Sequence, residues 1–160
     1  MKYRYLTFKE LAVMQEDFTN FLYTEGFSRF DWRVLQDQHS DQAVNLLARY
    51  SDKTFDKVMD SVQYLEYRSN KELRTYQCKS DELVLIGLQA PSHSAIDFTQ
   101  IDSLYYLESK DLMGYRCFKE VKPYQSEREK HVFNMIESGH YVVNEENFNY
   151  LKSLRLMNQN

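Results

Sequence analysis

The chain has 160 residues, of which 42% are apolar, and a formal net charge of −4. It is long enough to bury a core as one domain without disulfides, and its composition excludes wholesale disorder. The first 80 residues hold 12 Lys and Arg against 12 Asp and Glu, and the last 80 hold 8 against 12. Neither half contains a basic block, which disfavours binding to the phosphate backbone of a nucleic acid.

Cysteine use and hydropathy indicate a reducing, aqueous compartment. Cys78 and Cys117 are the only two cysteines, too few for a secreted disulfide scaffold. The N-terminus starts with a positive charge but lacks the apolar segment of a signal peptide. No stretch approaches the roughly 18 apolar residues of a membrane span. We therefore expect a cytoplasmic protein that has no membrane partner.

A helix-start signal opens the chain. Thr7 and Glu10 have the spacing of a capping box, in which each side chain accepts a hydrogen bond from a backbone amide of the other residue. An apolar stripe at helical spacing follows. The pattern predicts one helix over 8–25, which ends at Gly26 because glycine readily adopts a positive φ.

Two further helical segments follow. Ser28 is expected to begin a helix that carries Asp31 in its first turn and turns Trp32 inward. Helical spacing then covers 41–63. The pair Ser51-Asp52 lies inside this segment and both residues are good caps, so the pattern fits either one helix or two.

The middle of the chain changes to strand patterns. Alternating segments and an apolar run predict a β-hairpin over about 64–90, with strands at 64–68, 73–79 and 83–89. The last strand is apolar on both faces, which indicates an interior position in a sheet. Gly87 within it marks either a bulge or a close approach to the backbone.

Shorter elements complete the C-terminal half. We expect a short helix at 99–108 and a weaker strand at 115–121, which places Tyr115, Cys117 and Lys119 on one face. Ser126 and Glu129 repeat the capping-box spacing and predict a helix over 127–138. Its apolar positions are Val132, Phe133 and Ile136, and a last helix, capped by Asn144, carries Phe148, Leu151 and Leu154.

Together these elements predict a single domain over 1–160 of α+β class. The expected architecture is a small antiparallel sheet packed by N-terminal and C-terminal helices. The sheet consists of the hairpin at about 64–90 and the candidate strand at 115–121.

The sequence lacks the usual signatures of catalysis and metal binding. Its four glycines are too scattered to form a phosphate-binding loop, and its four histidines have no metal-ligand spacing. We therefore expect no catalytic, cofactor-binding or metal-binding residues. An alternative is a small enzyme with a dispersed site near Cys78, His93 and Cys117, which requires these side chains to converge.

Aromatic residues are abundant, with 13 Tyr, 10 Phe and one Trp. Tyrosine combines an apolar ring with a hydroxyl, so it suits the edge of a core and also an interface. Aromatic and basic residues are interleaved on the predicted strands, and they form a candidate interaction surface: Tyr64, Tyr67, Arg68, Arg74 and Tyr76. Our hypothesis is a protein-binding or adaptor module whose tyrosine-rich surface holds a protein partner or its own copy. Weak binding of single-stranded nucleic acid is a further alternative.

Three segments resemble a family of small uncharacterised cytosolic proteins from Bacteroidota, a domain of unknown function. They are the opening residues 1–7, the segment YLEYRSNKELRTYQCKSDELVLIGL at 64–88, and residues 124–139. Tyr67 stands where the family has histidine, so a role for histidine at that position does not carry over. The resemblance implies one intact domain, and it implies no substrate, cofactor or catalytic residue.

Overall fold

The computed structural model describes residues 1–38, 40–101, 104 and 112–157. Its chain forms two compact units, Met1–Asp60 and Ser61–Asn160, which are described here one after the other. The expected α+β class is confirmed, since these described residues form six α-helices and a five-stranded antiparallel sheet. Most of the helix expected at 99–108 lies outside the described residues, and the organisation as a single domain stays a prediction.

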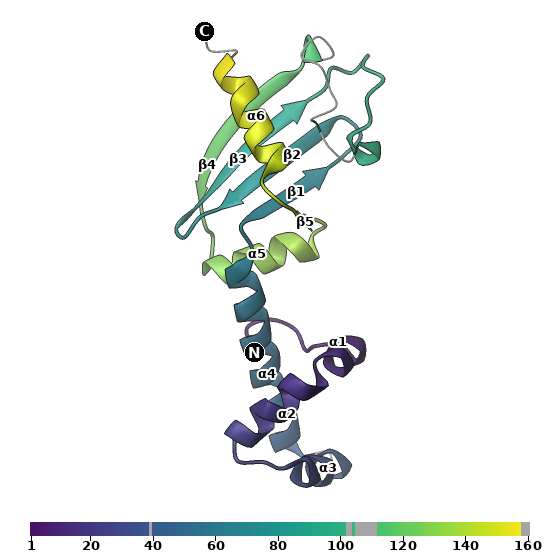
Figure 1. Ribbon diagram of the computed structural model, residues 1–160, viewed down its shortest axis with the longest axis vertical. Helices are drawn as coiled ribbons and strands as arrows, with labels where there is room; N and C mark the ends of the chain where they lie inside the picture. The colour runs from purple at the N-terminus through teal and green to yellow at the C-terminus, as the bar shows by residue number, and fades with distance from the viewer. Residues whose placement is uncertain (39, 102–103, 105–111, 158–160) are drawn as a thin grey trace. The chain divides into compact units, whose positions relative to one another are not determined.

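The first unit consists of helices α1 (Phe8–Val13), α2 (Gln15–Thr24), α3 (Arg29–Asp37) and α4 (Asp41–Ser61) (Figure 1). The prediction of one helix over 8–25 is wrong, because the backbone of Met14 (φ −100°, ψ 19°) separates α1 from α2. No glycine or proline marks this break in the sequence.

The predicted caps of these helices are present. Capping boxes begin α1 at Thr7 and α3 at Ser28, each with both reciprocal hydrogen bonds. Gly26 has a φ of 85°, and its amide and that of Phe27 donate to the carbonyls of Tyr23 and Leu22. This is the Schellman arrangement that ends a helix at glycine.

Residues 41–61 form one helix, which decides between the two readings of this segment. Ser51 and Asp52 cap another part of the chain instead. The hydroxyl of Ser51 accepts from the amide of Leu6 at 3.1 Å, and the carboxylate of Asp52 accepts from the amides of Lys2 and Tyr3 at 2.8 and 3.0 Å. Ser51 and Asp52 therefore hold the N-terminal segment along α4. The same two residue types are also common at helix starts, which is why the sequence allowed a second helix here.

An aromatic cluster forms the core of the first unit. The ring of Phe18 lies 4.8 Å from that of Tyr50 and 5.0 Å from that of Trp32 (centroid to centroid). Tyr50 is buried, and its hydroxyl donates to Asp17. These contacts tie α2, α3 and α4 together.

The second unit is built on the sheet, in the order β4-β3-β2-β1-β5. Its strands are β1 (Tyr64–Arg68), β2 (Glu72–Cys78), β3 (Glu82–Gln89), β4 (Arg116–Pro123) and β5 (Tyr141–Val142). The hairpin and the interior position of β3 are as expected. The strand expected at 115–121 is present as β4, whereas the two-residue β5 was not predicted.

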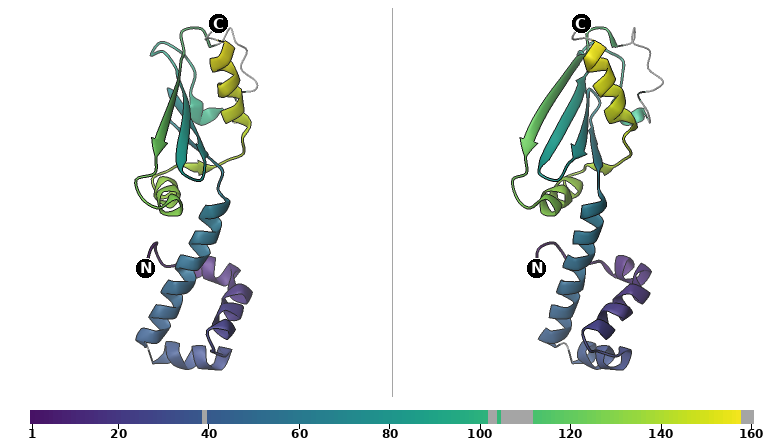
Figure 2. Two further views of the ribbon diagram at one scale, coloured as in Figure 1. Left: turned by 90° about the vertical axis from the view of Figure 1, so that its left-hand side faces the viewer. Right: turned by 60° about the vertical axis from the view of Figure 1, so that its left-hand side comes forward.

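Helices cover the two faces of the sheet unequally, as Figure 2 shows. Helix α6 (Glu146–Met157) packs on one side, here called the helix face, where its Phe148 and Leu151 join Val84, Ile86 and Leu88 in a buried core. Helix α5 (Arg128–Glu137) lies at the end of the other side, here called the open face. The upper part of the open face carries no helix among the described residues.

Gly87 marks a close approach on the open face, one of the two alternatives expected. It pairs with Phe118 of β4, and a Cβ atom built on Gly87 would lie 2.2 Å from Cζ of that ring. The ring of Phe118 thus occupies the space of the missing side chain. A glycine in an interior strand is explained by this packing.

The start of α5 departs from the expected capping box. Glu127 is the N-cap residue and makes no side-chain cap bond, while the hydroxyl of Ser126 donates to the carbonyl of Glu127. Met135 is buried together with Val132 and Phe133, and Ile136 is only half-buried. The apolar stripe of α5 is therefore rotated relative to the prediction.

The other expected C-terminal features are present. Asn144 accepts from the amide of Glu146 through its side chain, at the start of α6. Between β3 and β4 the structure adds a short 3-10 helix, η1 (Phe98–Gln100), with a buried Phe98. Within the described residues, no helix has the length and apolar character needed to cross a membrane.

Candidate functional site

The five residues of the expected interaction surface lie on both faces of the sheet. Because side chains alternate along a strand, Tyr67, Arg74 and Tyr76 lie on the open face. Tyr64 and Arg68 lie on the helix face, where the ring of Tyr64 packs 5.5 Å from that of Phe148. The structure therefore brings three of the five residues together on one face. The other two, Tyr64 and Arg68, make contacts on the opposite face of the sheet.

The three open-face residues contact each other and His140. The guanidinium of Arg74 lies 5.9 Å from the ring centroid of Tyr67, and the ring of His140 lies 5.4 Å from Tyr67 and 5.2 Å from Tyr76. Burial lowers the pKa of His140 and raises that of Tyr76. Arg74 pairs with Glu72 at 2.9 Å, and the hydrogen bond to Glu72 raises its pKa. The cation of this patch is already paired, which weakens its attraction for phosphate.

Most described tyrosines lie at the edge of a core. Tyr3 and Tyr50 are buried, and their hydroxyls donate to Asp56 at 2.7 Å and to Asp17 at 3.0 Å. Among the described residues, Tyr5, Tyr23 and Tyr141 are 41–61% exposed, whereas the two most exposed aromatic rings are phenylalanines, Phe8 at 94% and Phe30 at 74%. The abundance of tyrosine therefore reflects packing more than a tyrosine-rich surface.

The side chains of the dispersed-site alternative do not converge. Cys78 lies opposite Leu83 on the open face, and Cys117 lies opposite Leu88 on the helix face. Five residues of β3 separate these positions, which corresponds to about 17 Å along the strand. His93 lies exposed in the loop after β3. Burial raises the pKa of the Cys78 thiol to about 11 and also raises that of Cys117, the reverse of what a nucleophile requires.

A buried carboxylate on the helix face was not anticipated from the sequence. Glu66 is 1% exposed, and its carboxylate accepts from Nε and Nη2 of Arg68 at 2.9 and 2.7 Å and from Nδ2 of Asn147 at 2.8 Å. Asn147 in turn accepts from the amide of Leu104 at 3.0 Å, and Arg68 donates to the carbonyl of Ile101. Because both carboxylate oxygens are occupied, this network fixes α6 and the backbone at Ile101 and Leu104 to β1 rather than supplying a free acid or base.

No metal site follows from these clusters. Within the described part of the chain, no three His, Cys, Asp or Glu side chains gather closely enough to hold a metal ion. Buried side-chain nitrogen and oxygen atoms in the same part all have hydrogen-bond partners. The buried polar side chains of the described residues are therefore used in contacts within the protein.

One hollow lies on the first unit, between α1, α2 and α3. It has a volume of about 450 Å³ and is here called the helical groove. Phe18 and Leu22 form its buried base, Phe8 and Leu11 come from α1, and Trp32 comes from α3. The capping boxes and the turn at Gly26 position the three helices around it. A shallow apolar hollow with aromatic walls is typical of a groove that receives an apolar segment.

The charged residues of the helical groove are all basic. Arg29, Arg33 and Gln36 line it from α3 and Gln15 from α2, and none of its lining residues is acidic. Neither arginine makes an ion pair with another described residue. One signal for this surface is visible in the sequence, because Phe8 precedes Leu11 and Ala12 at helical spacings of three and four residues.

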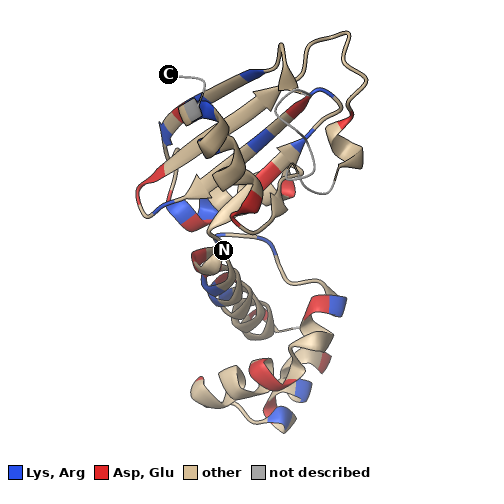
Figure 3. Ribbon diagram, turned by 45° about the horizontal axis from the view of Figure 1, so that its top comes forward, with Lys and Arg blue, Asp and Glu red and all other residues tan. Residues whose placement is uncertain are grey.

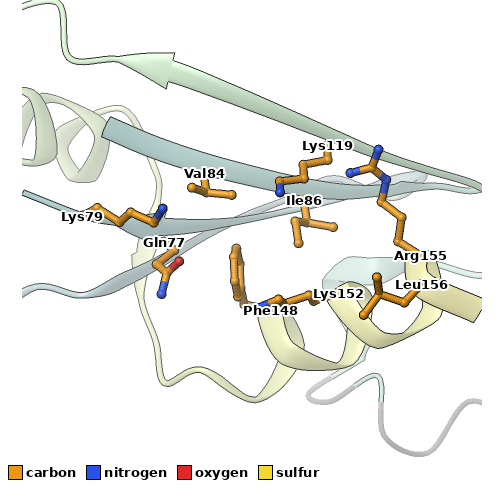
Figure 4. A pocket seen from close by; sticks show the side chains of 9 residues that line it. All are labelled: Gln77, Lys79, Val84, Ile86, Lys119, Phe148, Lys152, Arg155 and Leu156. Atoms are coloured by element: carbon orange, nitrogen blue, oxygen red, sulfur yellow. The ribbon is translucent and has the colours of Figure 1, made fainter. Parts of the chain in front are cut away.

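A second hollow lies on the other unit, between α6 and the helix face (Figure 4). It has a volume of about 300 Å³ and is here called the basic groove. Val84, Ile86 and Phe148 form its apolar floor. Four cations line it: Lys79, Lys119, Lys152 and Arg155. This convergence was not visible in the sequence, where the four residues are dispersed over the turn after β2, β4 and α6. Figure 3 shows both signs of charge along the ribbon of each unit.

Comparison with known proteins gives a family and no activity. A family model described as a family of unknown function (DUF6495) matches residues 1–155. No curated protein and no solved structure matches the chain. Any function must therefore be argued from the surfaces described above.

Proposed function

Because the chain belongs to DUF6495, a family of unknown function, we propose from its own surfaces that it is a protein-binding or adaptor module. In this proposal, the helical groove holds an apolar segment of a partner protein that also carries acidic side chains. The surface chemistry of α1, α2 and α3 supports this assignment.

The exposure of Phe8 is the observation that carries the proposal. A phenylalanine that is 94% exposed beside a hollow lined by Leu11 and Trp32 leaves a large apolar surface in water. Burying such a side chain contributes about 1.5–3 kcal/mol. Within the protein, Phe8 contributes almost none of this energy to folding, so the gain is available to a partner.

The charge of the helical groove specifies the partner further. Arg29 and Arg33 stand one helical turn apart on α3, and like charges at this spacing repel each other. An acidic side chain on the partner would relieve this repulsion and form a charge-assisted hydrogen bond. Arginine and aromatic residues are also the side chains that most often dominate binding energy at protein interfaces.

The remaining expectations fit this proposal as follows. Tyr67 and Arg74 on the open face are the part of the sequence-predicted surface that a partner can still reach. An enzyme using Cys78, His93 and Cys117 is set aside because these side chains do not converge. Cytoplasmic location and an origin in Bacteroidota stay predictions.

Two matched variants test the proposal. Phe8→Ala removes the exposed ring of the helical groove, whereas Phe30→Ala removes a comparably exposed ring on α3 that does not line it. Wild type and both variants are used as bait in lysate of the native cells, and the captured proteins are quantified by mass spectrometry. We expect at least one partner whose recovery falls about tenfold or more with Phe8→Ala and stays unchanged with Phe30→Ala.

The same experiment has clear contrary outcomes. Equal recovery of every captured protein with Phe8→Ala and Phe30→Ala would show that the helical groove does not bind a partner. Recovery of only a second copy of this chain would replace the adaptor assignment with self-association. Circular dichroism of the variants excludes unfolding as the cause of a lost partner.

A further inference from the structure

Three of the four cations of the basic groove lack the ion pairs that the fourth, Lys79, and several other cations of the same unit make. Arg68, Arg74, Lys79 and Lys122 pair with Glu66, Glu72, Glu82 and Glu120 at 2.7–2.9 Å. In contrast, Lys119, Lys152 and Arg155 make no ion pair with any described residue, although the protein has a net charge of −4. Three unpaired positive charges around one hollow repel one another unless an anion lies between them.

Local helix electrostatics explain only part of this arrangement. Arg155 lies in the last turn of α6, where the helix dipole favours positive charge, whereas Lys152 lies in the middle of that helix. Lys119 belongs to β4 and gains nothing from that dipole, yet its side chain lies across the same hollow (Figure 4). Lysine stems often cover apolar surface, but these stems leave a volume of about 300 Å³ open above Val84, Ile86 and Phe148.

We propose that the basic groove binds a small amphipathic anion, a carboxylate or phosphate group carrying an aliphatic or aromatic body. The head group would lie among Lys119, Lys152 and Arg155, and the apolar body would lie on Phe148 and Ile86. The apolar floor disfavours a free inorganic anion, and the basic rim disfavours a neutral or cationic amphiphile. A volume at the lower end of the range for ligand pockets indicates a short chain or a single ring.

This inference is independent of the proposed protein partner, because the basic groove lies on Ser61–Asn160 and the helical groove on Met1–Asp60. Binding of a small anion requires no partner protein. Failure of one proposal therefore leaves the other standing.

The test titrates the full chain with four octyl compounds below their micelle concentrations. Octanoate and octyl phosphate carry the anionic heads, and octyltrimethylammonium and octanol are the cationic and neutral controls. Two-dimensional amide NMR locates the binding site, and calorimetry gives the affinity. We expect saturable shifts at β3, β4 and α6 with the anions, weaker binding at high salt, and at least about tenfold weaker binding of both controls. The tighter anion shows whether a carboxylate or a phosphate source fits.

Two lysines of β4 provide a matched pair of variants. Lys119 lies on the helix face and lines the basic groove, whereas Lys122 lies on the open face and pairs with Glu120. Lys119→Gln should weaken binding of the anion about tenfold, and Lys122→Gln should leave it unchanged. The absence of saturable shifts, equal binding of octanol or octyltrimethylammonium, or equal affinity of the two lysine variants would overturn the proposal. The controls and the salt dependence use wild-type protein, so they decide the question even where a variant is poorly folded.

Discussion

Gly87→Ala tests how the open face of the sheet is packed. The new methyl group would lie 2.2 Å from Cζ of Phe118 and 2.7 Å from Cε1 and Cε2. Carbon atoms pack at about 3.5–4.0 Å, so the ring must move away from β3. Its cation–π partner Arg116, 5.2 Å from the ring centroid, must then move as well.

The expected magnitude follows from two opposing effects. Inserting a methylene-sized group into a packed site typically costs about 1–3 kcal/mol. Alanine recovers about 0.5–1 kcal/mol of the conformational entropy that glycine loses in a strand. Gly87 has no positive φ, so alanine suits its backbone. We therefore expect a net loss of about 1–2 kcal/mol in the free energy of unfolding.

A double-mutant cycle with Phe118→Ala isolates the contact. Without the ring, Gly87→Ala meets no obstacle and should be neutral or stabilising by up to about 1 kcal/mol. Unfolding in urea is followed by far-UV circular dichroism, with amide hydrogen exchange of β3 and β4. Fluorescence of Trp32, the single tryptophan, monitors the other unit. Equal stability of Gly87→Ala and wild type, or an equal cost in both backgrounds, would refute the packing argument.

Three further predictions concern buried and capping groups. Glu66→Ala leaves Arg68 half-buried without its carboxylate, and should lower the free energy of unfolding in urea by about 3 kcal/mol. Arg4 and Thr7 lower the pKa of Glu10 from 4.5 to about 2, so its stabilisation is present above pH 4.5 and is lost as the pH falls towards 2. The stability difference between wild type and Glu10→Gln, measured by Trp32 fluorescence in urea, should therefore be constant above about pH 5 and shrink below it. Burial raises the pKa of Cys78 to about 11, and mass spectrometry should show alkylation by iodoacetamide at neutral pH at least about tenfold slower than in the unfolded chain.

Contrary results are equally specific for these three. A loss below about 1 kcal/mol for Glu66→Ala would mean that the ion pair does not fix β1 to α6. A stability difference that stays constant down to about pH 2 would exclude a depressed pKa at Glu10. Alkylation of Cys78 as fast as in urea would show that its thiol is accessible.

Local signals in the sequence were sufficient for the helix caps and for the hairpin. Thr7, Ser28 and Gly26 act through hydrogen bonds and backbone angles within a few residues, so the local sequence is enough to predict where these helices begin and end. The apolar run of β3 likewise needs only its own composition to indicate an interior strand. These features were confirmed within one or two residues at their ends.

Features that depend on distant contacts were missed. Ser51 and Asp52 have the chemistry of a helix start, but their side chains accept hydrogen bonds from amides of the N-terminal segment, some 45–50 residues away. The break at Met14 has no local breaker residue, and β5 is two residues long and exists only through its pairing with β1. Which side of a helix faces the core also depends on distant contacts. In α5 Met135 is buried, whereas the sequence pattern indicated Ile136.

The candidate sites likewise combine features that local sequence patterns predict with features that depend on distant contacts. The apolar stripe of the predicted helix 8–25 included Leu11 and Phe18, and Trp32 was expected inward on the next helix, but neither pattern showed that Phe8 would remain exposed beside them. The strand alternation that separates Tyr64 from Tyr67 was available in the sequence, and it could have divided the expected surface between two faces. The basic groove requires the register of β3 with β4 and the placement of α6, which sequence spacing does not contain.

The most direct test of the protein-binding assignment is site-specific photocrosslinking in the native cells. A photoreactive phenylalanine analogue is placed at position 8 or, as the control, at position 30, and crosslinked peptides are identified by mass spectrometry. Our account predicts that position 8 joins a partner protein at an apolar segment flanked by acidic residues, and that position 30 does not. The same crosslinks from both positions, or crosslinks only to a second copy of the chain, would contradict it.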